Sequence, residues 1–327
     1  MNHRRTLGVI LLLAAALGLP QAATAQSDAE RVPALIKLIV PFAPGGSNDV
    51  IARVVGPALA KRLNTNLIIE NKPGAAGSIG SDAVAKAPKD GATLLLTSST
   101  LVTSAAAAPR TTPYDVLSAF APVAIIGQGP MLVAVSATMP IRTAAEFVAA
   151  ARAKPGDMSY GTAGPGSIAH MTSEMLADAA KIQMLHVPYK GAAPALLDLA
   201  SGQINMMVSN YSSLAPQIKA GRVRPLAVTS RNPSPSFPEL PSMASVAPGF
   251  AAEIWVAVFA PAGTPTALVQ RLNREINEIA RSPEVRSLLE ADGALPLALA
   301  PADVAQRIKD DFAAWKKIAT DKGITAE

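Results

Sequence analysis

Residues 35–49 read LIKLIVPFAPGGSND, and this stretch sets the pattern for the rest of the chain. Its apolar, β-branched first half predicts a buried strand over residues 35–42. Gly45 and Gly46 then allow a tight turn and a close approach of the backbone to a ligand. One of the polar residues 47–49 can cap the helix that follows. The stretch therefore predicts a strand, a glycine loop and a helix start, which is the unit of open α/β sheets.

Apolar strands and amphipathic helices alternate along the chain. The predicted strands cover residues 35–42, 66–70, 93–97, 123–127, 131–135, 182–187, 204–209, 223–229 and 253–260. The clearest helical patterns cover residues 143–153, 168–179, 194–199, 265–281 and 301–322. In the last, Val304, Ile308, Phe312, Trp315 and Ala319 recur every three or four residues and predict one buried stripe. This alternation predicts an α/β fold in which mostly parallel sheets are flanked by helices.

Two breaks in the alternation divide the chain. Strands 123–127 and 131–135 follow one another with only a short Gly-Pro segment between them, and a Pro-rich stretch precedes strand 253–260. We therefore expect two lobes joined by crossings near residues 128 and 252. The first lobe is predicted to contain residues 26–127 and 253–327, with the C-terminal helices returning to it, and the second lobe residues 128–252.

The first 25 residues have the features of a secretory signal peptide. Residues 3–5 are basic, residues 7–19 are apolar, and Ala23-Thr24-Ala25 is a small-x-small cleavage site. The apolar stretch is shorter than the roughly 20 residues that a membrane-spanning helix needs. We therefore expect cleavage after Ala25 and export of the remaining chain.

The composition excludes several classes of function. The 327 residues are 50% hydrophobic and 16% charged, which is enough apolar sequence for a large core. The chain has no cysteine and three histidines, which excludes disulfides, iron–sulfur clusters and thiol catalysis and disfavours a metal site. The net charge of +5 falls to +3 once Arg4 and Arg5 leave with the signal. We expect no cofactor, no metal and no nucleic-acid partner, but a weak preference for small anions.

Two glycine loops carry the strongest functional signal, because ligands of open α/β sheets bind beyond the carboxyl ends of the strands. Loop 41–49 opens a helix, whose free N–H groups and partial positive charge suit a carboxylate or a phosphate. Loop 160–170 has the same features, and Thr162 and Ser167 add hydroxyl donors. Gly164, Gly166 and Ala169 match the spacing of a dinucleotide fingerprint, but no acidic residue follows the next strand to hold a ribose. Two facing cradles for a small anion fit these loops better.

Shorter polar segments at 97–100, 189–191 and 209–211 follow other strands. Each alone is better explained as a helix cap or a surface turn, and only their joint position at strand ends favours a site. The nucleophile elbow, the phosphate-binding P-loop and the zinc-protease motif are missing from the sequence. An exported hydrolase that uses Ser98, His170 or Tyr189 remains the second hypothesis, since a catalytic triad is assembled in space and not in sequence.

Five blocks of sequence, in order, resemble the Bug family, the periplasmic solute-binding proteins of tripartite tricarboxylate transporters. The blocks are PFAPGG at 41–46 with Asp49 and Arg53, ENKPGA at 70–75, GTAG at 161–164 with Gly166, Ser167 and His170, VPYKG at 187–191 with Pro194, Asp198 and Gly202, and APAGTP at 260–265. Together they span nearly all of the chain after the signal. One small departure is Ala76-Gly77, where a further glycine is frequent in the family.

The resemblance implies a two-lobed, type II periplasmic-binding-protein fold that closes like a Venus flytrap on one small solute, with no catalysis. It implies that a solute carboxylate is held between the two glycine loops by backbone groups and ordered waters. It also implies a periplasmic location and delivery of the solute to integral-membrane transporter subunits, and we expect a monomer. The ligand-binding residues carried over from the family are Phe42, Ala43, Gly45, Gly46, Ser47, Asp49, Ser98, Thr162, Gly164, Ser167, His170, Tyr189 and Asn210.

Two questions stay open at the level of sequence. A monocarboxylate, a dicarboxylate, an aromatic acid, an amino acid or a neutral analogue would all fit the same cradle. Transport and ligand sensing as a co-receptor share one binding step, so the chain alone does not separate them.

Overall fold

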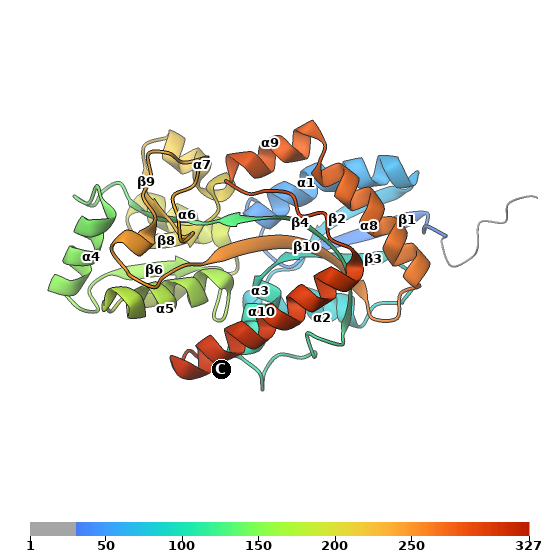
Figure 1. Ribbon diagram of the computed structural model, residues 1–327, viewed down its shortest axis with the longest axis horizontal. Coiled ribbons are helices and arrows are strands. Elements are labelled where there is room, and N and C mark those ends of the chain that lie inside the picture. The colour runs from blue at the N-terminus through green and yellow to red at the C-terminus, as the bar shows by residue number, and fades with distance from the viewer. Residues whose placement is uncertain (1–30, 327) are drawn as a thin grey trace, which may run out of the picture.

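The computed structural model describes residues 31–326, and these residues form two lobes side by side (Figure 1). Each lobe is built on a five-stranded sheet, which confirms the predicted two-lobed α/β fold. The predicted cleavage site after Ala25 lies outside the described residues. No helix within residues 31–326 is both long and apolar enough to cross a membrane.

The first sheet combines strands from the beginning of the described chain with β10, which returns after the second lobe. Its strands, in spatial order, are β2 (Asn66–Asn71), β1 (Leu35–Val40), β3 (Thr93–Ser98), β10 (Glu253–Pro261) and β4 (Phe120–Pro130). The helices of this lobe are α1 (Ser47–Leu63), α2 (Ser78–Ala85), α3 (Thr100–Ala107), α8 (Thr266–Ala280), α9 (Pro283–Ala291) and α10 (Pro301–Asp321), with the short η2 (Ala75–Gly77) before α2.

The second sheet repeats this plan. Its strands, in spatial order, are β7 (Leu185–Pro188), β6 (Ser159–Thr162), β8 (Met206–Ser209), β5 (Leu132–Ser136) and β9 (Val223–Val228). The helices are α4 (Ala144–Ala153), α5 (Ile168–Ala180), α6 (Ala192–Ser201) and α7 (Tyr211–Lys219), with the short η3 (Met243–Ser245) before the chain returns. The chain passes between the sheets twice, from β4 into β5 and from the segment after η3 into β10.

The sequence predicts mostly parallel sheets, and in each sheet all strands but one run in the same direction, which makes both sheets mixed. In the first sheet β1 pairs in parallel with β2 and β3, but β10 runs antiparallel to β3 and β4. In the second sheet β6 pairs in parallel with β7 and β8, but β5 runs antiparallel to β8 and β9. The antiparallel pairs arise because β4 and β10 carry the chain out of the first lobe and back into it, in opposite directions. Helix–strand alternation says nothing about this part of each sheet.

Both faces of each sheet are buried. Because successive side chains of a strand point to opposite faces, they pack into two different parts of the core. In β1, Ile36 and Leu38 pack on the face covered by α1 and α8, whereas Ile39 packs on the face covered by α3 and α10. In β5, Val133 and Leu132 likewise belong to separate clusters on opposite faces. Strands buried on both faces read as continuous apolar runs, which is why they stand out in the sequence.

The last helix reaches beyond the lobe to which the sequence assigns it. Val304 and Ile308 of α10 pack under the first sheet, as the predicted stripe requires. Further along, Trp315 contacts the cores of both lobes, and Lys322 pairs with Asp178 of α5 in the second lobe. α10 therefore lies across the junction of the lobes, where it extends toward the foreground in Figure 1.

Candidate functional site

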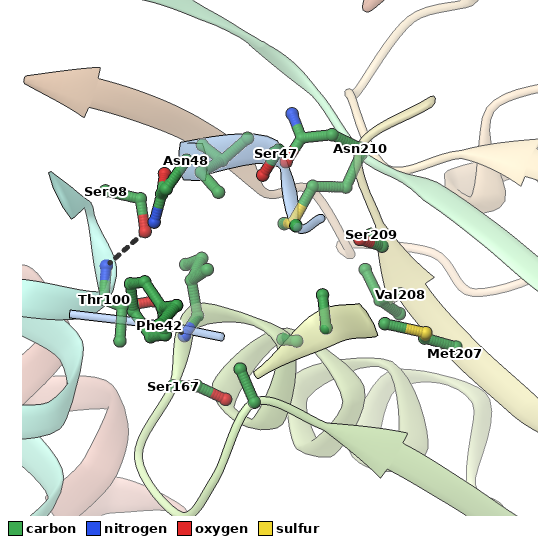
Figure 2. Close-up of a pocket in the computed structure, with 17 residues that line it drawn as sticks. Phe42, Ser47, Asn48, Ser98, Thr100, Ser167, Met207, Val208, Ser209 and Asn210 are labelled. Atoms are coloured by element: carbon green, nitrogen blue, oxygen red, sulfur yellow. Dashed lines mark hydrogen bonds between the residues drawn. The ribbon is translucent and has the colours of Figure 1, made fainter. Parts of the chain in front are cut away.

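A cavity lies between the lobes, where loops that follow strands of both sheets meet (Figure 2). The volume open to the centres of water molecules is about 50 Å³. The residues that line it are Phe42, Gly46, Ser47, Asn48, Ser98, Thr100, Met131, Ala163, Ser167, Ile168, Ala169, Ala192, Met207, Val208, Ser209, Asn210 and Ile254.

Five helices begin at this cavity. α1 and α3 of the first lobe start beside it at Ser47 and Thr100, and α5, α6 and α7 of the second lobe start at Ile168, at Ala192 and just after Asn210. The first N–H groups of a helix have no partner within the helix, and each helix start carries a partial positive charge. Together these starts make a partly positive environment from backbone alone, which suits an anion, although the carboxylate of Asp292 already binds the Ser212 N–H at the start of α7.

Four polar side chains in the cavity wall are buried without a hydrogen-bond partner. Ser47, Asn48, Ser209 and Asn210 are 9%, 6%, 7% and 5% exposed, and none of their side chains forms a hydrogen bond within residues 31–326. Ser47 and Asn48 come from the first lobe and Ser209 and Asn210 from the second, and all four are labelled in Figure 2. Of their polar atoms only Asn48 Oδ1 is buried and without a partner, whereas the others reach the cavity. All four side chains are therefore available to form hydrogen bonds with a molecule in the cavity.

The described residues that line the cavity include no charged side chain. Neutral hydroxyl and amide groups come from both lobes, and apolar side chains fill the rest of the wall. In Figure 2, Ser98 and Thr100 lie on one side of the cavity, and Met207 and Val208 lie on the opposite side. A solute here would be held by neutral donors and helix starts at its polar end and by apolar contacts elsewhere.

Direct contacts between the lobes close the cavity. The Ile168 N–H of α5 donates to the Thr100 hydroxyl of α3 at 3.2 Å. The Ala43 N–H donates to the Lys190 carbonyl at 3.4 Å. Gly45 and Gly46 face Ala193 and Ala192 of α6, so a Cβ added to either glycine would lie 3.6 or 3.7 Å from an alanine methyl. The structure is therefore a closed arrangement of the two lobes.

Asp49 shapes the first loop and does not line the cavity. Its carboxylate accepts hydrogen bonds from the Gly45 N–H and from Arg53, each at 2.9 Å, and from Asn71 at 3.0 Å. Burial alone would raise the pKa of Asp49, but these hydrogen bonds outweigh it and hold the pKa below its usual value. The carboxylate thus stabilises the turn at Gly45, whose φ of +86° favours glycine.

Polar groups of the second loop are likewise used within the second lobe. The Thr162 hydroxyl lies 2.6 Å from His186 Nε2, and Nδ1 of His170 accepts from the Gly166 N–H at 3.0 Å. The two imidazole rings stack with their centres 4.1 Å apart. Burial lowers the pKa of His170 to about 4, so the ring is neutral and can accept that hydrogen bond. These contacts set the shape of the loop from behind.

The predicted site residues thus fall into two groups. Phe42, Gly46, Ser47, Ser98, Ser167 and Asn210 line the cavity. Ala43, Gly45, Asp49, Thr162, Gly164, His170 and Tyr189 do not line it. Tyr189 donates its hydroxyl to Asp198 at 2.6 Å, and Gly164 instead faces Ala76 across the lobe boundary.

Sequence reasoning missed Asn48 as a residue that lines the cavity, because a polar residue after a glycine loop is explained by capping alone. Thr100 and Ser209 lie within segments that the sequence singles out, but the residues carried over from the family do not include them. It also missed the apolar wall made by Met131, Met207, Val208 and Ile254. Met131 and Ile254 lie where the chain crosses between the lobes. Their position at these crossings is the one feature of the sequence that could have indicated that they line the cavity.

Comparison with known proteins shows to which protein family the chain belongs. The family model described as "Tripartite tricarboxylate transporter family receptor" matches residues 51–324. The chain belongs to this family. Protein BugT of Bordetella pertussis is 35% identical over 328 residues, which cover 99% of each chain. A UPF0065 protein from the tcbD-tcbE intergenic region of Pseudomonas sp. strain P51 is 38% identical over 309 residues, which cover 93% of this chain and 92% of the relative.

Solved structures of similar receptors share the fold over almost their whole length. "R. palustris Rpa4515 with adipate" is 33% identical with a TM-score of 0.85, covering 89% of this chain and 98% of the other. MatC from Rhodopseudomonas palustris with bound malate is 29% identical with a TM-score of 0.82, covering 87% and 98%. A TctC solute-binding protein from Polaromonas with no ligand is 28% identical, covering 88% and 98%, but its TM-score is 0.62.

Proposed function

We propose that this receptor binds one small carboxylate-bearing solute in the cavity between its lobes and delivers it, unchanged, to the membrane subunits of a tripartite tricarboxylate transporter. The carrying observation is the set of four buried, unpartnered polar side chains that lie among five helix starts. Helix starts favour an anion, and hydroxyl and amide groups can donate to carboxylate oxygens. The bound adipate and malate of two relatives, both carboxylates, support this solute class.

Closure around the solute is the second part of the proposal. The two relatives with bound solute have TM-scores of 0.85 and 0.82, whereas the relative with no ligand has 0.62 at similar identity and coverage. The difference supports a hinge motion in which the lobes of this chain close as in the solute-bound relatives. The hinge would lie at the two crossings between the first lobe, residues 26–127 and 253–327, and the second lobe, residues 128–252.

The remaining expectations belong to the same proposal. Phe42, Gly46, Ser47, Ser98, Ser167 and Asn210, joined by Asn48 and Ser209, would contact the solute, while the other predicted residues shape the walls. The chain would be exported to the periplasm, cleaved after Ala25 and active as a monomer. A sensor in place of the transporter would use the same binding step.

The alternative of an exported hydrolase has less support. The Thr162–His186 pair resembles a nucleophile beside a base, but Thr162 is fully buried and does not line the cavity. Ser98, which does line it, accepts a hydrogen bond from the Thr100 N–H at 3.4 Å and has no imidazole as a partner. A nucleophile, a base and an orienting group around one reacting atom are therefore not assembled in the part of the chain that the structure describes.

Calorimetric titration with small carboxylates tests the proposal. The chain is first unfolded and refolded to release any solute bound in the host. A carboxylate should bind with micromolar or tighter affinity, and nuclear magnetic resonance should find it unchanged after incubation. Ser209→Ala and Asn210→Ala should each weaken binding about tenfold, because each removes a hydrogen bond of about 1–1.5 kcal/mol.

Ser213→Ala is the matched control for these variants. Ser213 is also buried with an unpartnered hydroxyl and lies in the same helix, α7, but it does not line the cavity. Its substitution should leave affinity unchanged. Turnover of the carboxylate, or equal affinity in Asn210→Ala and wild type, would overturn the proposed binding site.

A further inference from the structure

Helix α7 begins in an unusual way, and its start is part of the cavity. Asn210 occupies the N-cap position of α7, where a side chain normally accepts a hydrogen bond from an N–H group of the first turn. Here the Asn210 side chain makes no such bond and lines the cavity. The N–H that it would otherwise bind therefore needs another acceptor.

That acceptor comes from the other lobe. Asp292 follows the last turn of α9 in the first lobe, and its carboxylate accepts from the Ser212 N–H at 2.5 Å and from the Ser212 hydroxyl at 2.8 Å. Ser212 lies in the first turn of α7 in the second lobe. Asp292 is only 2% exposed, so the two bonds form within a water-excluded contact between the lobes.

We propose that Asp292 is an interlobe latch: in the closed molecule it caps α7 in place of Asn210, which leaves the Asn210 side chain free to contact the solute. When the lobes separate, Ser212 loses this partner and Asn210 can turn back to cap its own helix. Closure and solute binding are thereby coupled through one carboxylate. The inference rests on the proposed function only for its affinity readout, because the latch itself is a contact between lobes.

The charge of the latch makes closure depend on pH. Burial raises the pKa of Asp292 to about 6, and the two hydrogen bonds from Ser212 only partly oppose this. In an open molecule the carboxyl would be hydrated, with a pKa near 3.8. The closed form then holds its proton more tightly than the open form, so closure is favoured as the pH falls from about 7 toward 4 and is opposed as the pH rises through 6.

The charged side chains on the helices around the latch are not among the causes of the raised pKa of Asp292. The charged side chains on α9 and on the helices packed against it, α1, α7 and α8, are Asp49, Arg53, Lys61, Arg62, Lys219, Arg271, Arg274, Glu275, Glu278, Glu284, Arg286 and Glu290. Asp49 pairs with Arg53, Arg62 with Glu275, and Arg286 with Glu290. Burial and Ser212 are what act on the pKa of Asp292.

The test compares adipate affinity at pH 7.5 and pH 5.0 in variants of the refolded chain. The carboxyl groups of adipate begin to take up protons at pH 5.0, so the latch is measured by the ratio of wild-type to Asp292→Asn affinity, in which that effect cancels. This ratio should be about tenfold larger at pH 5.0 than at pH 7.5, the factor that follows from pKa values near 6 and 3.8 in the closed and open forms. Asp292→Asn keeps an acceptor for Ser212 without the charge, so its own affinity should change with pH only as far as adipate titrates. Asp292→Ala should weaken binding, and Asp292→Ala with Asn210→Ala together should be no weaker than Asp292→Ala alone.

Asp178→Asn is the matched control, since Asp178 also joins the lobes through Lys322 but is exposed. It should retain the tenfold pH effect. An unchanged pH effect in Asp292→Asn, or additive losses in the double variant, would overturn the latch.

Solution scattering of the chain without solute separates the latch from the proposed function. If adipate does not bind, the carboxylate proposal is weakened, but the solute-free chain should still be more compact at pH 5.0 than at 7.5. A radius of gyration equal at both pH values, or one that still falls at pH 5.0 in Asp292→Asn, would overturn the latch on its own.

Discussion

Truncating Met207 to alanine should change which solutes the receptor prefers. Met207 is 1% exposed and lies on the side of the cavity opposite Ser98 and Thr100 (Figure 2). The substitution removes three heavy atoms from the wall of a cavity of only about 50 Å³. A solute tail longer by two methylene groups could then be buried. At about 0.8 kcal/mol per methylene, the gain is about 1.6 kcal/mol, or roughly fifteenfold in affinity.

Titration with straight-chain carboxylates of increasing length measures this change. The tightest-binding solute should be one to three carbons longer for Met207→Ala than for wild type. Met206→Ala is the matched control, because both methionines are buried in core clusters of the same lobe, but only Met207 also lines the cavity. Both variants should lose about 2–5 kcal/mol of unfolding free energy, as large-to-small core substitutions do. The same length optimum in Met207→Ala and wild type, or an equal shift in Met206→Ala, would refute the assignment of this wall to the solute tail.

Three further predictions follow from the loops. Gly46→Ala should bind a carboxylate normally, because the added Cβ would make an ordinary contact with Ala192. Gly46→Val should bind at least tenfold more weakly, because its extra methyl groups would meet α6 or enter the cavity. Wild-type affinity of the valine variant in a titration would show that this loop is not part of the site. Gly45→Ala should instead lose about 1–2 kcal/mol of unfolding free energy in denaturant titrations, since the backbone φ there is +86°, and a wild-type midpoint would contradict that strain. His170 is buried and neutral, with a pKa of about 4, so it should contribute on the order of 3 kcal/mol of unfolding free energy above pH 6.5 that is lost as the pH falls toward 4. Half-buried His186 titrates in the same range, so His170→Gln should remove only part of this pH dependence in denaturant titrations. An unfolding free energy that depends on pH in the variant as it does in wild type would contradict the lowered pKa of His170.

The fold could be predicted well because its strands are buried on both faces. Runs such as Leu35–Val40 and Thr93–Ser98 are predominantly apolar, and each is followed by a turn and a helix, so that local pattern and tertiary role agree. The predicted mostly parallel sheets are also present, but one strand of each, β10 or β5, runs against the others. The direction of β10 depends on where the chain re-enters the first sheet, and no local pattern encodes that.

The site could be predicted only in outline. Loops 41–49 and 160–170 stand out because a glycine turn before a helix is a local feature. Whether a polar side chain in such a loop faces the solute or holds the loop depends on its partners. Asp49 and His170 have partners within their own lobes, whereas Asn48 has none.

The sequence by itself determined the α/β class, the two-lobed division, the glycine loops and, through five ordered blocks, the family. These features are local in the chain, since periodicity, turn residues and short motifs act over a few residues. Only the tertiary structure decided that five helix starts share one cavity, that Met131 and Met207 line it, and that Asp292 reaches α7 across the lobe boundary. Asp292 and Ser212 are 80 residues apart in the chain, and their contact exists only because both sheets and the crossings between them bring α9 and α7 together.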